Sequence, residues 1–439
     1  GLPPNNASGD FTLNLGIINN TIAGTGSDSI SYELQIGNGD RSNAESHAVV
    51  HETIEIAGNT ITVDESSDAI DILHEIQEVD PYIDPSPDRV YSDITVAGNT
   101  LFGEYEFDVL GNLTNVLGNA AINIDTGLDR SSVGATSGDP VSHMPDLVAD
   151  RRTIMDSKIA VVNNTILGGF GDGVAIEMIV GSGAGDNELS EGHVVTLTAL
   201  IDGNTIRNID DEGITVEQLV NDDNSRVTGD YTISNNLIEM AFEEFVPVGG
   251  GPVFIPDGQG IRIENYTGSN DQGTGGESIQ SARVVNNTIR HTAGDGFGVD
   301  NHSDVGLARQ TIVFEDNVVF GAGFVDQDSD PVDVDFDQGY NLQNISEGGT
   351  AIQHITIRRD NVSNSGADGL YAENVMRARN TNCGGSENCV PSPAVYTAEQ
   401  TIIVEDSVFT LNVDDGLQFR NEIDDDDGGA ALGNIASVV

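Results

Sequence analysis

The chain has 439 residues, of which 37% are hydrophobic and 5% aromatic, so it can bury a substantial core although it contains no tryptophan. Its 72 acidic residues outnumber 17 basic ones, only one of which (Lys158) is a lysine, and the formal net charge is −55 at pH 7. The negative electrostatic field of such a charge argues against nucleic acid and anionic membrane surfaces as partners. It suits a protein of saline surroundings, where salt screens the repulsion between carboxylates.

No apolar run reaches the roughly 18 residues that a membrane-spanning segment needs, so we expect no membrane insertion. Two cysteines, Cys383 and Cys389, stand in C-G-G-S-E-N-C. This spacing predicts a small disulfide loop, because two thiols alone make a poor zinc site. Nine N-x-S/T sequons also occur, a motif that arises by chance in asparagine-rich chains. We therefore expect an extracellular or cell-surface protein.

The chain repeats itself from its first predicted strand, which runs through Leu13, Leu15 and Ile17. That strand leads into the phrase IINNTI, and relatives of this phrase return at intervals of 30 to 65 residues, each preceded by alternating apolar residues. The anchor residues of the successive copies are Asn20, Asn59, Asn99, Asn164, Asn204, Asn236, Asn287, Asn317, Asn361 and, in a degenerate copy, Ser407.

A second phrase follows each first one, and it consists of a turn, usually with glycine, and apolar residues at i and i+2, the pattern of a strand with one buried face. In chain order the copies are DAIDIL (68–73), AAINID (120–125), GDGVAIEM (171–178), DEGITVEQ (211–218), GQGIRIEN (258–265), GDGFGVDN (294–301), ADGLYAEN (367–374) and DDGLQFRN (414–421).

Each unit thus holds about three short strands and lacks the apolar helix of a βαβ unit. Three strands per unit with asparagine corners and variable loops resemble the right-handed parallel β-helix, the pectate-lyase-like superfold. The resemblance covers nearly the whole chain and implies an all-β solenoid of about ten coils, formed by residues 1–439 as a single domain. Stacked asparagines would form a hydrogen-bonded ladder at one corner. Long loop insertions are expected near residues 102–156, 240–257, 322–340 and 377–400.

The register of the second phrase separates inward from outward residues. Val174 and Ile176, for example, point inward, and the next residue points outward. From coil to coil this outward column reads Asp125, Glu177, Glu217, Glu264, Asp300, Gln343, Glu373 and Arg420. Like charges about 5 Å apart repel by nearly 1 kcal/mol even in water, so the column requires bound divalent cations, concentrated salt or raised pKa values.

One position further on stands a column of asparagines, which we interpret as the other corner of the coil. Its members are Asn265, Asn301, Asn344, Asn374 and Asn421.

Calcium is the first explanation for the carboxylates, because it prefers hard oxygen ligands. Glu217, Glu264 and Asp300 of the outward column are candidate ligands. The loop DQDSDPVDVDFD is similar to an EF-hand loop, but Pro331 stands where that loop needs glycine. The alternative is that such acidic loops are simply solvated. The loop's candidate ligands are Asp326, Asp328, Asp330, Asp333, Asp335 and Asp337.

Glycoside hydrolysis is the second explanation. Carboxylates one coil apart suit a retaining mechanism and those two coils apart an inverting one. The pairs Glu264–Asp300 and Asp300–Glu373 fit these spacings. Asp414-Asp415-Gly416 is similar to the paired aspartates of polygalacturonases, whose Arg-x-Lys is missing here.

A polysaccharide lyase or epimerase is the third explanation. Asp300-Asn301-His302 resembles the Asp-Pro-His-Glu strand of mannuronan C5-epimerases, with Asn301 for proline and Ser303 for glutamate. Enzymes of polyuronates must neutralise a carboxylate, whereas this chain would repel a polyanion. His302 is therefore also interpreted as a surface histidine just past a strand end.

We expect a non-enzymatic, cation-stabilised solenoid of an extracellular filament, surface layer or adhesin. Neither end of the sequence predicts a capping helix, so either the chain is a piece of a longer surface protein or its ends stack on other copies. Other copies stacked end to end or neighbouring surface proteins are the expected partners. The alternative is a secreted polysaccharide hydrolase or lyase that uses Glu264, Asp300, His302 and Glu373.

Overall fold

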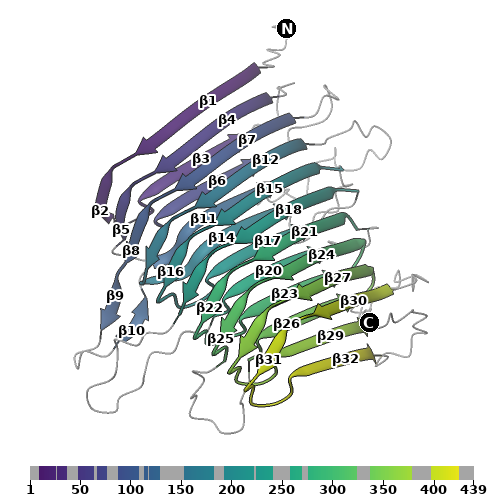
Figure 1. Cartoon of the computed structure of the whole chain (residues 1–439). Coiled ribbons are helices and arrows are strands. Elements are labelled where there is room, and N and C mark those ends of the chain that lie inside the picture. Colours follow the sequence, from purple (N-terminus) through teal and green to yellow (C-terminus); the bar gives the residue numbers. More distant parts are fainter. Residues whose placement is uncertain are drawn as a thin grey trace, which may run out of the picture.

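The computed structural model shows a right-handed parallel β-helix of ten coils, as the repeats predict (Figure 1). It contains three parallel sheets of ten strands each and, within the described residues, no helix. The described residues are 9–25, 27–36, 48–63, 67–76, 88–107, 113–116, 118–128, 153–181, 192–221, 224–240, 258–268, 275–323, 337–377 and 397–424.

Each coil contributes one strand to each sheet, in the order A, B, C. Sheet A consists of β1 (Gly9–Ile18), β4 (Ala48–Ala57), β7 (Asp88–Ala97), β12 (Thr153–Val162), β15 (Val194–Asp202), β18 (Arg226–Ser234), β21 (Glu277–Val285), β24 (Leu307–Glu315), β27 (Thr350–Arg358) and β30 (Thr397–Glu405). Sheet B consists of the shorter β2 (Thr21–Thr25), β5 (Thr60–Val63), β8 (Thr100–Gly103), β13 (Thr165–Leu167), β16 (Thr205–Arg207), β19 (Leu237–Glu239), β22 (Thr288–Arg290), β25 (Val318–Phe320), β28 (Asn361–Ser363) and β31 (Val408–Thr410). Sheet C consists of β3 (Ile30–Ile36), β6 (Ile70–Ile76), β11 (Gly118–Leu128), β14 (Phe170–Val180), β17 (Ile214–Val220), β20 (Ile261–Thr267), β23 (Phe297–Ser303), β26 (Tyr340–Ser346), β29 (Leu370–Arg377) and β32 (Leu417–Asp424).

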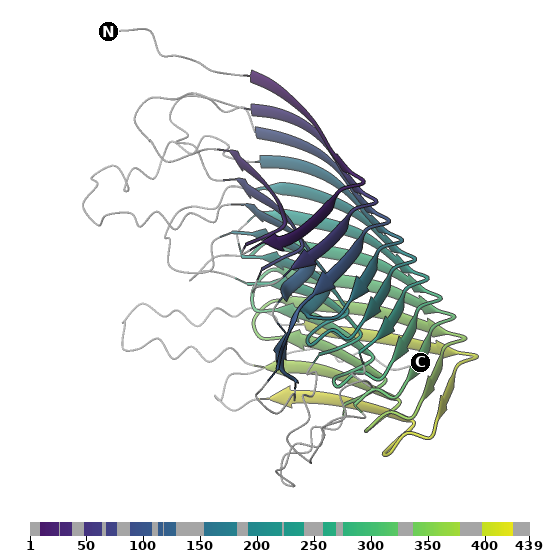
Figure 2. The same cartoon turned by 90° about the vertical axis from the view of Figure 1, so that its left-hand side faces the viewer.

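The predicted insertions follow strands of sheets B and C, and most of their residues lie outside the described part of the chain. The one near 102–156 is not a single loop. It includes β11, the start of β12, and an antiparallel hairpin of β9 (Tyr105–Phe107) and β10 (Leu113–Val116). The extra hairpin lengthens the third coil without interrupting the three sheets, which follow a common axis through all coils (Figure 2).

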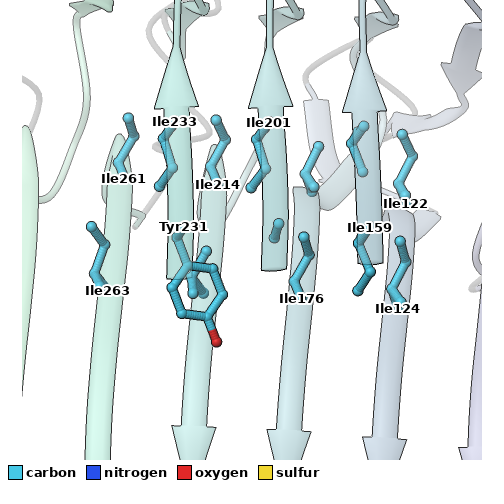
Figure 3. Packing of buried hydrophobic residues seen from close by; sticks show 14 of the residues in the cluster. Ile122, Ile124, Ile159, Ile176, Ile201, Ile214, Tyr231, Ile233, Ile261 and Ile263 are labelled. Atoms are coloured by element: carbon cyan, nitrogen blue, oxygen red, sulfur yellow. The ribbon is translucent and has the colours of Figure 1, made fainter. Parts of the chain in front are cut away.

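The core lies between the sheets and is built from stacked aliphatic side chains. Ile159 and Ile201 of sheet A lie beside Ile124, Ile176 and Ile214 of sheet C, and all five are buried (Figure 3). Strand residues alternate between buried and outward positions, so each coil presents the same columns to the next. Burial of one such side chain stabilises the fold by about 1.5–3 kcal/mol.

The corner between sheets A and B carries the predicted asparagine ladder. At Asn204, the side-chain oxygen accepts hydrogen bonds from the backbone N–H (2.9 Å) and side-chain amide (3.0 Å) of Asn164. Its own amide donates to Val161 O (2.9 Å) and Asn236 Oδ1 (3.0 Å). Because an amide both donates and accepts, identical residues satisfy one another from coil to coil.

Near its end, the ladder departs from the prediction. The ladder position after Asn317 is Asp360, which accepts the Asn317 N–H at 2.7 Å, and Ser407 follows as predicted. Asn361 was the wrong choice, because it pairs with Val318 at the start of β28. An aspartate can accept from the coil before it, and this makes the substitution compatible with the ladder.

The residue before each ladder position has a left-handed backbone. This explains why asparagine or glycine precedes the ladder asparagine in each of the first seven coils, as at Asn19 (φ 58°) and Gly58 (φ 66°). The later coils place Asp316 and Arg359 there, also at positive φ. The repeated phrase is thus a turn motif, in which one residue supplies the conformation and the next supplies the hydrogen bonds.

The second asparagine column is not a corner, which corrects our interpretation. The first four of these residues are buried within sheet C and point into the core, and Asn421 continues their column on the exposed tenth coil. Asn265 donates to Asn301 Oδ1 and Asn301 to Asn344 Oδ1, each at 2.7 Å. The alternation was sufficient to predict this, since Asn301 has the same parity as Val299.

We predict that Asn204→Ala lowers the free energy of unfolding by about 2–4 kcal/mol, because it leaves the buried groups of Val161 and Asn164 without partners. Chemical denaturation measures the change. Asn20→Ala, at the exposed start of the same ladder, is the matched control and should cost less than about 1 kcal/mol. Equal losses at the two positions would contradict a cooperative ladder.

Candidate functional site

The outer face of sheet C carries the outward column that the sequence predicts. Backbone pairing places its members directly beside one another, in the predicted order. The successive partners are Asp125, Glu177, Glu217, Glu264, Asp300, Gln343, Glu373 and Arg420. At its end Arg420 Nη1 lies 3.1 Å from Glu373 Oε1, so this carboxylate is neutralised by an ion pair.

A second acidic column, which we did not predict, lies at the turn before sheet C. In several coils its carboxylate accepts the backbone N–H of the corresponding residue in the next coil, as Asp172 does from Glu212 (3.0 Å) and Asp295 from Gln338 (2.7 Å). The signal was present in the middle letter of phrases such as GDG and DEG, which we read only as glycine turns. Its members include Asp28, Asp68, Asp172, Glu212, Gln259, Asp295, Gln338, Asp368 and Asp415.

Arg262, on β20, bridges the two columns. Its Nη1 lies 3.3 Å from Glu212 Oε1 in the turn column, and its Nη2 lies 2.5 Å from Glu264 Oε1 in the outward column. Glu264 is in turn the strand neighbour of Asp300. We call Asp172, Glu212, Arg262, Glu264 and Asp300 the Arg262 cluster. One guanidinium is thus surrounded by four carboxyl groups.

This imbalance changes the protonation of the cluster. Burial, together with the negative charge of Glu264, raises the pKa of Asp300 to about 7. Burial and the neighbouring Asp211 and Asp172 raise the pKa of Glu212 to about 9. At neutral pH, bound protons on Asp300 and Glu212 therefore reduce the negative charge of the cluster, in addition to the positive charge of Arg262. Raised pKa values, one of the three explanations for the carboxylate column, apply to this part of it.

Polar atoms without hydrogen-bond partners lie beside the cluster. Thr215, Arg262, Gly298 and Asn341 are consecutive strand neighbours, and Gln259 lies over Gly298, where a Cβ would meet its Oε1 at 1.7 Å. The partnerless buried atoms are Thr215 Oγ1, Gln259 Oε1, Arg262 Nε and Asn341 Oδ1. These buried atoms include both donors and acceptors, a set that ordered water can satisfy.

A glutamine ladder in the core supports the outward column from beneath. Gln310 donates to Gln280 Oε1 (2.8 Å) and to the backbone carbonyl of Asp300 (3.2 Å). Gln280 binds the carbonyl of Glu264 in the same way, at 2.8 Å. The carboxylates of the cluster therefore stand on backbone that buried amides fix in place.

Three other predicted site residues, Glu217, His302 and Glu373, lie on the same outer face of sheet C as Asp300. Glu373 is paired with Arg420, and Glu217 lies in the outward column beside Glu264. His302 is not past a strand end, as we expected, but lies within β23, half-buried on the same face as Asp300.

The predicted acidic loop and disulfide cannot be placed on this structure. Of the loop aspartates only Asp337 belongs to the described residues. The positions outside them are Asp326, Asp328, Asp330, Asp333, Asp335, Cys383 and Cys389.

Three groups of side chains within the described ranges bring possible metal ligands within 4.8 Å of one another. Two are purely acidic: one comprises Asp172, Asp211 and Glu212, and the other Asp368, Asp414 and Asp415. The second includes the pair that is similar to polygalacturonase aspartates. The third group is His302, Asp304 and Glu347.

The chain matches no protein-family model, no curated protein and no solved structure. Among the described residues there is no helix long and apolar enough to cross a membrane. The arrangement of its own residues therefore carries the functional argument.

We predict that Asp300→Asn stabilises the protein at pH 8 by on the order of 2 kcal/mol and has little effect at pH 5. A carboxyl group whose pKa is raised by folding binds its proton more tightly in the folded state. Its contribution to stability is present below the unfolded pKa of about 4 and is lost as pH rises through the folded value of about 7. Unfolding curves recorded from pH 5 to 8 measure the effect.

The matched control is Asp93→Asn, on the exposed outer face of sheet A, which should leave the pH dependence of stability near that of the wild type. A destabilised Asp300→Asn variant at pH 8 would contradict proton sharing in the cluster.

Proposed function

We propose that this protein is an acidic structural solenoid of an extracellular or cell-surface assembly, in which copies stack end to end. The observation that carries the proposal is the surface of the tenth coil. There, core positions that are buried in every middle coil are open to solvent.

The apolar columns of sheet C make the contrast. Leu370 in the ninth coil is 0% exposed, whereas its strand neighbour Leu417 in the tenth is 43% exposed. Phe419 and Ile423 are 36% and 47% exposed, and Val413 in the preceding turn is 69% exposed. This apolar surface has the shape of a coil, so another coil is the partner that would cover it best.

The asparagine ladder makes the two end coils complementary. Its hydrogen bonds run from the backbone N–H of one coil to the side-chain oxygen of the next, as from Asn20 to Asn59 Oδ1 (2.8 Å). Within the described residues no partner is recorded for Asn20 Oδ1 in the first coil or the Ser407 N–H in the tenth. A second copy stacked in register would join this donor to this acceptor.

Charge sets the conditions for such stacking. With a net charge of −55, copies repel one another unless salt or divalent cations screen the carboxylates. Calcium belongs to the proposal for this reason, since carboxylates and amide oxygens are the ligands it prefers. Head-to-tail contact between unlike surfaces generates an open filament rather than a closed ring.

We predict that the wild type forms elongated assemblies in concentrated salt with calcium and that the double variant Val413→Asp/Leu417→Asp stays monomeric. Two carboxylates in the apolar end surface would be buried unpaired upon stacking. Sedimentation velocity and electron microscopy measure assembly. Leu200→Asp is the matched control, because Leu200 is 39% exposed on the outer face of sheet A, away from both end coils.

A wild-type chain that remains monomeric in these conditions, with a melting temperature indifferent to a calcium chelator, would overturn the proposal. Assembly by the double variant to the wild-type extent would show that copies associate through another surface.

Hydrolysis of a neutral polysaccharide at the Arg262 cluster is a second candidate function. It is favoured by one observation: Glu264, which forms an ion pair with Arg262, is the strand neighbour of Asp300, a carboxyl group whose pKa is raised by burial. Glycosidases of the retaining type use a protonated acid and an ionised carboxylate about 5 Å apart, close to the spacing of neighbouring strands.

The roles follow from the environments. Asp300, with its pKa of about 7, would protonate the glycosidic oxygen, while Glu264, which forms an ion pair with Arg262, would attack the anomeric carbon. A polyuronate is a poorer substrate than a neutral glycan, because Arg262 and Arg420 are already paired with glutamates.

We predict that the protein releases oligosaccharides from a neutral glycan, with a rate that falls as pH rises through about 7, where Asp300 loses its proton. Asp300→Asn should lower this rate by about 10²–10⁴-fold. Reducing-end assays across a panel of neutral and acidic polysaccharides measure release. Glu177→Gln, three coils away in the same column, is the control and should retain activity.

A panel without any product would remove this candidate and leave the stacking proposal untouched. Release that survives Asp300→Asn would assign the chemistry to other residues.

A further inference from the structure

We propose that His302, Asp304 and Glu347 form a binding site for one zinc ion or a similar divalent transition metal. The three side chains come from two neighbouring coils. His302 lies near the end of β23, Asp304 just after it, and Glu347 just after the neighbouring strand β26. Parallel pairing of the two strands brings their following residues to the same edge of sheet C.

The ligand atoms converge on a common point. His302 Nε2 lies 2.9 Å from Asp304 Oδ1 and 4.0 Å from Glu347 Oε1, and all three atoms lie within 4.8 Å of one another. Two ligands that each lie about 2.1 Å from a tetrahedral zinc ion are about 3.4 Å apart. The two observed separations bracket that value, so small side-chain adjustments would accommodate the ion.

The histidine nitrogen lies close to both carboxylates and is unsatisfied. His302 Nε2 is buried from solvent and, despite its closeness to Asp304, has no hydrogen-bond partner of acceptable geometry. A buried nitrogen without a hydrogen bond, close to two carboxylates, is compatible with coordination of a shared cation.

Neighbouring residues hold these ligands in place. The Tyr266 hydroxyl donates a hydrogen bond to Asp304 Oδ2, and its ring meets the His302 ring edge-on at 4.9 Å. Arg377 Nη1 lies 3.3 Å from Glu347 Oε1. Such outer contacts orient metal ligands, but Arg377 is also a cation that competes for the same oxygen.

The ligand set favours zinc over calcium. An imidazole nitrogen suits zinc and its neighbours in the transition series, whereas calcium requires six to eight oxygens. Three protein ligands would leave a coordination position open. That position would lie on the face that carries Asp300, two residues before His302, but the inference does not depend on either proposed function.

The test is titration of chelator-stripped protein with zinc, in excess calcium to saturate non-specific carboxylates. We expect one saturable zinc site in the wild type, with cobalt giving the intense visible absorption of a four-coordinate nitrogen–oxygen site. His302→Gln should weaken binding by at least about 100-fold, and Tyr266→Phe by about tenfold. Arg377→Gln should tighten it, because a competing cation is removed.

His354→Gln is the matched control. His354 lies on β27, and its strand neighbours Thr311 and Thr401 supply no carboxylate, so this variant should bind zinc as the wild type does. Circular dichroism in chelator verifies that each variant is folded, and Glu347→Gln replaces His302→Gln if the latter is not. Equal zinc affinity in the wild type and the ligand variant, or a preference for calcium over zinc at this site, would overturn the proposal.

Discussion

In-register parallel stacking is the constraint on which this structure depends. Each side chain meets its counterpart in the next coil at about 4.8 Å, so every residue type in a column must be compatible with itself. Aliphatic side chains satisfy this condition by packing, and amides satisfy it because each donates to one neighbour and accepts from the other. Apolar side chains, among them many isoleucines, therefore form the columns of the core, and asparagines form most of the corner ladder.

Carboxylates are the residues that fail this condition, and the outer face of sheet C shows how the chain accommodates them. Arg262 and Arg420 each form ion pairs with glutamates, and burial raises the pKa of Asp300 so that it keeps its proton more readily. Buried glutamines hold the backbone of the column from within. The buried glutamine ladder thus fixes the backbone of the strands that carry the Arg262 cluster. A binding surface requires rigid support of this kind.

The periodic features of the fold, such as the columns of side chains, could be predicted from the sequence, whereas contacts that occur in only one coil could not. Column membership on sheet C followed from counting residues after the glycine turn, because alternation fixes the face of every strand residue. Asn361 was misassigned because asparagine identity was given more weight than its distance from the preceding strand, where Asp360 holds the equivalent place. The contact of His302 with Glu347 joins a residue near the end of one strand to a residue just after the next strand of sheet C, 45 positions later. This separation is set by the connection between coils, to which no repeat gives a signal.

The proposed stacking and the sites on sheet C use different surfaces of the same rod. Stacking covers the open faces of the end coils, whereas the Arg262 cluster and His302 lie on a lateral face in the middle coils. Ten coils at about 4.8 Å span roughly 50 Å, so a filament of this chain would repeat each lateral site at about that interval. Regular spacing makes a weak lateral site effective toward a long polymer, because linked contacts add as avidity. A structural rod and a polysaccharide-directed surface are therefore compatible properties of this fold.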